Sequence, residues 1–164
     1  MSYRVTSGKL TVKARSSVHD TTTTWDKVSG DIDAHPDTLA TQGATAKFTV
    51  DMTAFDAGDW LKNRKLRKDF EMDSHPRATF TLKKVSDVIR DGAKFTANAE
   101  GVLGWRGREV VLKISGQGTL DDRRVTASGS FELDIRDLGL SAPRFLMFKV
   151  QDEVTVTVSF EGAA

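Results

Sequence analysis

The chain has 164 residues, a formal net charge of +1 and no cysteine. This length predicts one domain spanning residues 1–164, large enough to bury a sizeable core without disulfides. The balanced charge argues against a protein that coats nucleic acid, so no nucleic-acid partner is expected. The lack of cysteine excludes disulfides, thiolate catalysis and cysteine-based zinc sites.

The sequence shows no sign of membrane insertion. No apolar run approaches the ~18 residues of a membrane span, so no transmembrane segment is expected. The N-terminal sequence MSYRVTSGKL lacks the apolar stretch of a signal peptide. We therefore expect a cytoplasmic protein if Met1 is the native start, and a periplasmic one if a leader was removed. Both a monomer and a homodimer are compatible with the sequence.

Apolar and polar residues alternate in eight separate runs, a pattern typical of strands with one buried and one solvent-facing side. Turn signals such as Asp91-Gly92 and Asp121-Asp122 lie between the runs. One-sided alternation favours antiparallel pairing, and such strands close into a barrel or pack as a sandwich. In chain order the runs cover residues 9–15, 28–32, 44–52, 78–83, 95–101, 110–116, 125–135 and 154–160.

A helical pattern occurs in one short stretch between the third and fourth runs. Asp56 can serve as its N-cap, and Asp59 at the third helical position resembles a capping box. Leu66 and Phe70 are four residues apart and can share one face of the helix. We predict one short helical cap around residues 57–67.

The same stretch concentrates positive charge, because five of the seven residues from Lys62 to Lys68 are basic. A nucleic-acid patch, a lid over a ligand site and a solvated helix face are the three interpretations. The acidic residues that follow would repel phosphates, and Trp60 and Phe70 occupy positions suited to packing under the helix rather than to stacking on bases. The helix dipole also favours cations near its C-terminal end. We therefore set the nucleic-acid interpretation aside.

The presumed inward face of the strands carries no charged residue and mixes bulky with very small side chains. An eight-stranded barrel either fills itself or holds one small ligand. An apolar void stays dry and accepts apolar guests, whereas packed interiors are the general rule, so the residues alone leave both possibilities open. The bulky residues are Phe48, Phe80, Phe95, Phe131, Leu133 and Phe160, and the small ones are Ala14, Ala44, Ala46, Ala97, Ala99, Gly101, Ala127 and Gly129.

No constellation of residues argues for catalysis. The histidines His19, His35 and His75 lack a paired ligand spacing, so no metal site is expected. No nucleophile elbow, phosphate-binding loop or dinucleotide fingerprint is present, so we expect no cofactor and no enzyme activity. An enzyme that uses His19 and Asp20 near a pocket mouth is a minor alternative.

The most specific pattern lies between Leu61 and Phe80, where Leu66, Phe70, Pro76 and Phe80 recur in a distinctive order and spacing. On these residues the chain resembles the YceI-like family of polyisoprenoid-binding, lipocalin-like barrels, over nearly its whole length. Three further segments resemble family motifs: residues 15–18, 101–112 and 152–156.

The resemblance implies an all-β fold, an eight-stranded antiparallel lipocalin-like barrel that holds a long isoprenoid in an apolar tunnel. We therefore expect non-enzymatic binding, for storage or transport, of an isoprenoid or other long-chain lipid. Lys62, Arg64 and Arg67 are predicted to attract an anionic headgroup. The predicted ligand-binding residues, which line the tunnel or cap it, are Phe48, Trp60, Leu66, Phe70, Phe80, Phe95, Leu112, Phe131, Leu133 and Val156.

A second hypothesis belongs to a different class of protein. A packed barrel without a bound lipid could act as a stress-associated interaction or structural module. Its sign would be a filled interior together with an exposed apolar patch, for example around Phe145 to Phe148.

Overall fold

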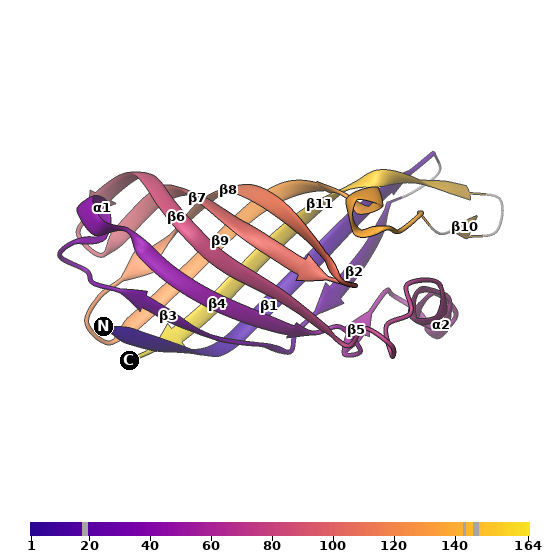
Figure 1. Ribbon diagram of the computed structural model, residues 1–164, viewed down its shortest axis with the longest axis horizontal. Coiled ribbons are helices and arrows are strands. Elements are labelled where there is room, and N and C mark those ends of the chain that lie inside the picture. Colours follow the sequence, from indigo (N-terminus) through magenta and orange to yellow (C-terminus); the bar gives the residue numbers. More distant parts are fainter. Residues whose placement is uncertain (18–19, 143, 146–147) are drawn as a thin grey trace.

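The computed structural model describes residues 1–17, 20–142, 144–145 and 148–164. Long antiparallel strands wrap into a closed eight-stranded barrel, because the last strand of the chain pairs back onto the first (Figure 1). The predicted fold class is confirmed. In order around the barrel the strands are β1 (Ser2–Ser16), β3 (Val28–Ala34), β4 (Ala44–Asp51), β6 (Arg77–Asp91), β7 (Lys94–Trp105), β8 (Arg108–Leu120), β9 (Arg124–Asp134) and β11 (Phe148–Ala163).

Three shorter strands extend this wall: β2 (Thr21–Trp25), β5 (Phe55–Asp56) and β10 (Arg144–Phe145). β3 pairs with residues 2–4 of β1, and β2 pairs with residues 10–14 of β1. The long strand β1 therefore has two successive partners on the same side. The sequence TTTTW hid β2 because it shows no apolar alternation. In the structure Thr21, Thr23 and Trp25 are all buried. Every second side chain of β2 therefore faces the interior, although four of its five residues are threonine.

The strands run further than the alternating sequence indicated. β6 continues to Asp91, yet its register with β7 shifts between Leu82 and Lys84 and again between Ser86 and Ile89. A register shift of this kind inserts an extra residue and moves the following side chains to the other face. This explains why the apolar alternation stops near residue 83 while the strand does not.

Two helices and a 3₁₀ turn complete the fold: α1 (Leu39–Gln42), α2 (Trp60–Asp69) and η1 (Ile135–Leu138). Figure 1 shows α1 and α2 at opposite ends of the barrel, with both chain termini near the α1 end. The predicted helical cap exists as α2, but its N-cap was wrong. Asp59 caps the helix by accepting a hydrogen bond from the Lys62 backbone N–H at 2.8 Å. Asp56 instead accepts from Gly58 N–H in the preceding turn.

The buried core divides into two clusters, one at each end of the barrel. The cluster at the α2 end is built around Trp25, Met72 and Trp105. The cluster at the α1 end is built around Tyr3 and Leu120. The first cluster also reaches into the barrel interior through Leu112, Leu133 and Val156.

Glycines allow the strands to bend tightly in the barrel wall. A Cβ at Gly118 would collide with the Thr126 carbonyl oxygen of the neighbouring strand β9 and lie 2.8 Å from the Ala127 Cα. A Cβ at Gly101 would collide with the ring of Phe80. The small residues of the inner face thus have two uses, since Gly118 relieves a backbone contact and Gly101 makes room for a large side chain.

Replacing Gly118 by alanine should destabilise the fold by about 1–3 kcal/mol, because the new methyl group overpacks a contact made by backbone. Urea denaturation measures the change. The control is Gln117→Ala on the adjacent, exposed position, for which we expect a change within about 0.5 kcal/mol. Equal stabilities for the two variants would show that β8 and β9 do not approach as closely as described.

Candidate ligand-binding cavity

A cavity of about 300 Å³ lies inside the barrel between the two packed ends. Its lining is almost wholly apolar, and among the described residues no charged side chain takes part. Thr79, Gln117 and Ser128 also border it, next to the inward-facing residues of their strands, and Gln117 and Ser128 border the outer surface as well. A dry, uncharged cavity of this kind accepts an apolar guest and offers little to hold a polar one.

The phenylalanine side chains that face the cavity are only partly buried. Phe48 lies between Phe80 and Phe160, with ring centroids 6.4 and 4.9 Å apart respectively. On β7, the strand next to that of Phe80, Ala97 and Ala99 present only methyl groups to the same space. A packed barrel would bury these rings fully, so the interior is not filled, contrary to what the packed-barrel hypothesis requires.

At the α1 end Leu39 and Leu120 line the cavity, and Tyr3 is buried with them in the same core cluster. The Tyr3 hydroxyl donates a hydrogen bond to the Asp121 carbonyl at 2.6 Å, which satisfies the one polar atom of that ring. Burial, with a contribution from Asp122, raises the pKa of Tyr3 above its ordinary value, so the phenol stays neutral. This end of the barrel is therefore packed with apolar groups, and the hydroxyl group of Tyr3 has a hydrogen-bond partner.

At the α2 end two tryptophans close the cavity. The Trp25 indole N–H donates to the Met52 carbonyl at 3.2 Å, and the Trp105 indole N–H donates to the His75 carbonyl at 2.8 Å. Phe70, the residue that ends α2, also lines the cavity. The C-terminal end of the helix is therefore part of the cavity wall.

Two arginines fasten this segment to the barrel. Arg67 donates to the Thr53 carbonyl and to the Asp73 carboxylate, both at 2.9 Å. Arg106, at the tip of the β7–β8 hairpin, donates to the Phe70 carbonyl at 2.6 Å and to Glu71 at 3.3 Å. These charge-assisted bonds hold the cap in one position against the barrel.

The barrel wall has a seam near this end. β8 and β9 pair only from Ser115 and Ser130 to Leu120 and Val125, so their remaining lengths diverge toward the α2 end. Leu138 of η1 and the nearby Leu140 are buried there and line the cavity. Side chains rather than backbone hydrogen bonds therefore close this part of the wall.

Most of the predicted ligand-binding residues line the cavity. Leu66 does not line it, and its side chain is buried on the inner face of α2 in the core cluster at that end. Trp60 does not either, and the expectation that it packs under the helix was wrong, since its side chain is 70% exposed. The helix begins after Asp59, which turns its first residue, Trp60, outward. The predicted residues that line the cavity are Phe48, Phe70, Phe80, Phe95, Leu112, Phe131, Leu133 and Val156.

The three residues predicted to attract a headgroup lie on α2 in different surroundings. The Arg67 guanidinium is engaged with the cap and also lies over the Phe55 ring, 5.2 Å from its centroid. Arg64 is exposed and Lys62 is partly buried. Their role toward a headgroup stays a prediction.

Some cavity residues escaped the sequence analysis. Trp25, Met52, Leu138 and Leu140 line the space at the α2 end. All but Met52 lie outside the alternating runs, and Met52 ends one of them. A signal was present for Trp25, Leu138 and Leu140, because each is an apolar residue in a stretch of sequence without apolar alternation.

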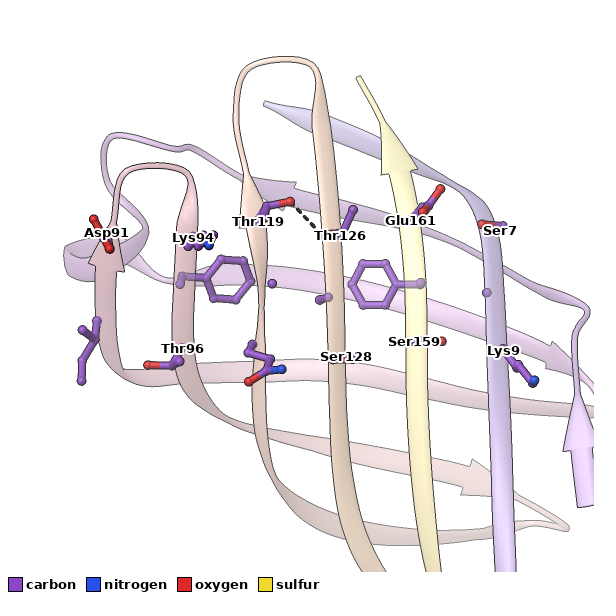
Figure 2. A pocket seen from close by; sticks show the side chains of 17 residues that line it. Ser7, Lys9, Asp91, Lys94, Thr96, Thr119, Thr126, Ser128, Ser159 and Glu161 are labelled. Carbon is purple, nitrogen blue, oxygen red and sulfur yellow. Dashed lines mark hydrogen bonds between the residues drawn. The ribbon is translucent and has the colours of Figure 1, made fainter. Parts of the chain in front are cut away.

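A second hollow of about 750 Å³ lies on the outside of the barrel, across β6, β7, β8, β9, β11 and β1. Figure 2 shows the side chains that line it, including the hydrogen bond between the Thr119 and Thr126 hydroxyl groups at 2.7 Å. It is a broad, open depression with side chains of Lys94 and Glu161 at its rim. Because it is open to solvent, it does not enclose an apolar ligand as the interior cavity does.

Two expectations concern residues outside the described part of the chain. His19 lies outside it, and Asp20 makes an ion pair with Lys13 at 3.3 Å. The apolar patch around Phe145 to Phe148 also falls where side chains are not described. Within the described ranges, no group of three histidine, aspartate or glutamate side chains is arranged to hold a metal. The helices found there are too short or too polar to cross a membrane.

Comparison with known proteins identifies the family of this chain. The family model of the YceI-like domain matches residues 3–162. The chain belongs to the YceI-like domain family. Among curated proteins, no sequence matches this YceI-like chain.

Solved structures share the YceI-like fold along most of their length. A polyisoprenoid-binding domain from Saccharophagus degradans, implicated in plant cell wall breakdown, has a TM-score of 0.79 at 17% identity and covers 99% of this chain and 98% of its own. BcnA from Burkholderia cenocepacia has a TM-score of 0.77 at 21% identity, with 94% and 95% covered. The YceI protein of Campylobacter jejuni has a TM-score of 0.68 at 15% identity, with 87% and 84% covered. At these identities the likeness establishes the shared fold.

Arg67→Met should loosen the cap and destabilise the fold by about 1–2 kcal/mol. The lost bond to the Thr53 carbonyl accounts for most of this, because the exposed ion pair with Asp73 contributes little. Hydrogen exchange over residues 59–75 and thermal unfolding measure the effect. The exposed neighbour Arg64→Met is the control and should leave both unchanged. Equal exchange in the two variants would contradict the assignment of Arg67 as a fastening residue.

Proposed function

We propose that this YceI-like chain binds a long apolar isoprenoid or similar lipid inside the barrel, without catalysis, for storage or transport. The observation that carries the proposal is the cavity itself, which is uncharged, incompletely filled and flanked by packed side chains at both ends. Burial of each methylene contributes about 0.8 kcal/mol, so an apolar chain needs few polar contacts to bind.

The comparisons support the same class of ligand. A domain with this fold, from Saccharophagus degradans, is described as polyisoprenoid-binding. Eight predicted residues meet around one cavity in our chain, and their chemistry suits a prenyl chain. The partly buried phenylalanine rings would become buried on binding, which supplies the driving force for uptake.

The volume limits the chain length in the present conformation. A methylene-sized group occupies roughly the ~30 Å³ of a water molecule, so about 300 Å³ holds about ten such groups, or two prenyl units. Ten groups would contribute about 8 kcal/mol before the association penalty of about 4–15 kcal/mol. A longer chain in a wider cavity would bind more tightly, and the seam between β8 and β9 is a part of the wall that can widen without breaking backbone hydrogen bonds.

Native mass spectrometry of the freshly purified protein, followed by lipid extraction, tests the main proposal. Titration with geraniol, farnesol and geranylgeraniol should give affinity that rises with chain length. An empty protein that takes up none of these alcohols would overturn the proposal. Such a result would favour the alternative of an interaction or structural module, which the unfilled interior argues against.

The double variant Ala97→Leu/Ala99→Leu should lower the amount of bound prenyl alcohol at least tenfold, because two isobutyl groups would occupy the space that the ligand needs. Bound ligand is counted by native mass spectrometry, and circular dichroism checks the fold. The matched control is Thr96→Leu, which places the same side chain on the outer face of β7. Undiminished binding by the double variant would show that the ligand lies elsewhere.

A further inference from the structure

The first turn of α2 exposes two large apolar side chains side by side. Trp60 is 70% exposed and Leu61 is 62% exposed. Single exposed apolar residues are common and need no explanation, as with Ile89 and Val111 elsewhere on the barrel. An adjacent tryptophan and leucine are different, because α2 lies outside the wall of strands at one end of the barrel (Figure 1).

The same face of α2 is basic. Leu61, Arg64 and Lys68 are three and four residues apart and share one side of the helix, and Trp60 lies one turn before Arg64. All four side chains are exposed. The helix thus presents apolar groups and cations together on its outer surface.

Three acidic residues near α2 are paired with cations that lie outside this face. Asp69 pairs with Lys65, Glu71 with Arg106 and Asp73 with Arg67, so these acids leave the charge of Arg64 and Lys68 in place. Asp56 and Asp59 instead accept hydrogen bonds from backbone N–H groups, which do not offset their charge. Hydrogen bonds from Gly58 first and Asn63 second hold the pKa of Asp56 below its usual range, so it stays negative. Both residues precede the helix, whereas Arg64 and Lys68 lie within it.

We propose that the outer face of α2, formed by Trp60, Leu61, Arg64 and Lys68, docks onto an anionic lipid bilayer surface. Tryptophan suits the membrane interface because its ring is apolar and its N–H is polar. Basic side chains are attracted to anionic headgroups, and the combination of an apolar and a basic surface is typical of helices that lie on a membrane.

The inner side of α2 supports docking of the helix as a rigid element. Leu66 is buried beneath it, and Arg67 and Arg106 fasten it to the barrel. Phe70, which ends the helix, lines the cavity. Docking would therefore bring the α2 end of the cavity against the bilayer. Docking depends on the surface of α2 and is independent of any ligand inside the barrel.

Tryptophan fluorescence tests docking directly. The chain has three tryptophans, and Trp25 and Trp105 are buried, so Trp60 alone reports on the surface. Phosphatidylcholine vesicles containing phosphatidylglycerol should shift its emission to the blue and protect it from acrylamide. Pure phosphatidylcholine should have a weaker effect, and high salt should reduce binding to the anionic vesicles.

Vesicle co-sedimentation of variants separates the two contributions. Arg64→Gln/Lys68→Gln should lower partition onto the anionic vesicles about thirtyfold, and Trp60→Ser/Leu61→Ser at least about tenfold. Ile89→Ser is the matched control, because Ile89 is also 70% exposed but lies on β6, and it should partition like the parent.

Three outcomes would overturn the proposal: no partition onto anionic vesicles, an equal loss in Ile89→Ser, or self-association in sedimentation velocity that Trp60→Ser/Leu61→Ser abolishes. The last would make a second copy of the chain the occupant of this face. The vesicles contain no prenyl lipid, so a chain that docks but takes up no prenyl alcohol would overturn the proposed function and leave the docking inference standing.

Discussion

The pairing of the first strand with the last is the constraint on which the rest of the structure depends. β1 and β11 pair along most of their length, from Arg4 opposite Ala163 to Ser16 opposite Val150. This closure joins the two outer edges of the sheet and commits alternate side chains to one enclosed space. The total volume of those inward side chains then decides whether the barrel interior is filled or contains a cavity. The recurring alanines and glycines leave it hollow.

The core divides into two clusters because the inward side chains have too little total volume to fill the whole barrel. Large side chains gather where the polar ends of tryptophan and tyrosine can reach backbone carbonyls, near Met52, His75 and Asp121. Such partners lie in the loops at the two ends and not in the middle of a strand, where the backbone groups are used by neighbouring strands. The middle of the barrel is therefore lined by groups without hydrogen-bonding capacity, which suits an apolar chain.

The alternating runs predicted the eight strands and most of the cavity lining because burial on one face imposes a period of two. The prediction failed where another requirement overrode that period. Thr21 and Thr23 are buried although polar, so β2 was missed, and register shifts after Leu82 hid the far half of β6. At the cap, the choice between Asp56 and Asp59 as N-cap displaced the helix start and reversed the expected side of Trp60. A three-residue error is small along the chain but turns a side chain from the core to solvent.

Both chain termini lie near the α1 end, at the far end of the barrel from α2 (Figure 1). A tag, reporter or surface linker joined at either terminus would therefore extend from the side of the barrel that carries the core cluster around Tyr3. Molecules immobilised in this way would all present α2 and the adjoining cavity wall outward in a common orientation. The fold thus lends itself to oriented display, with one end for attachment and the other left free.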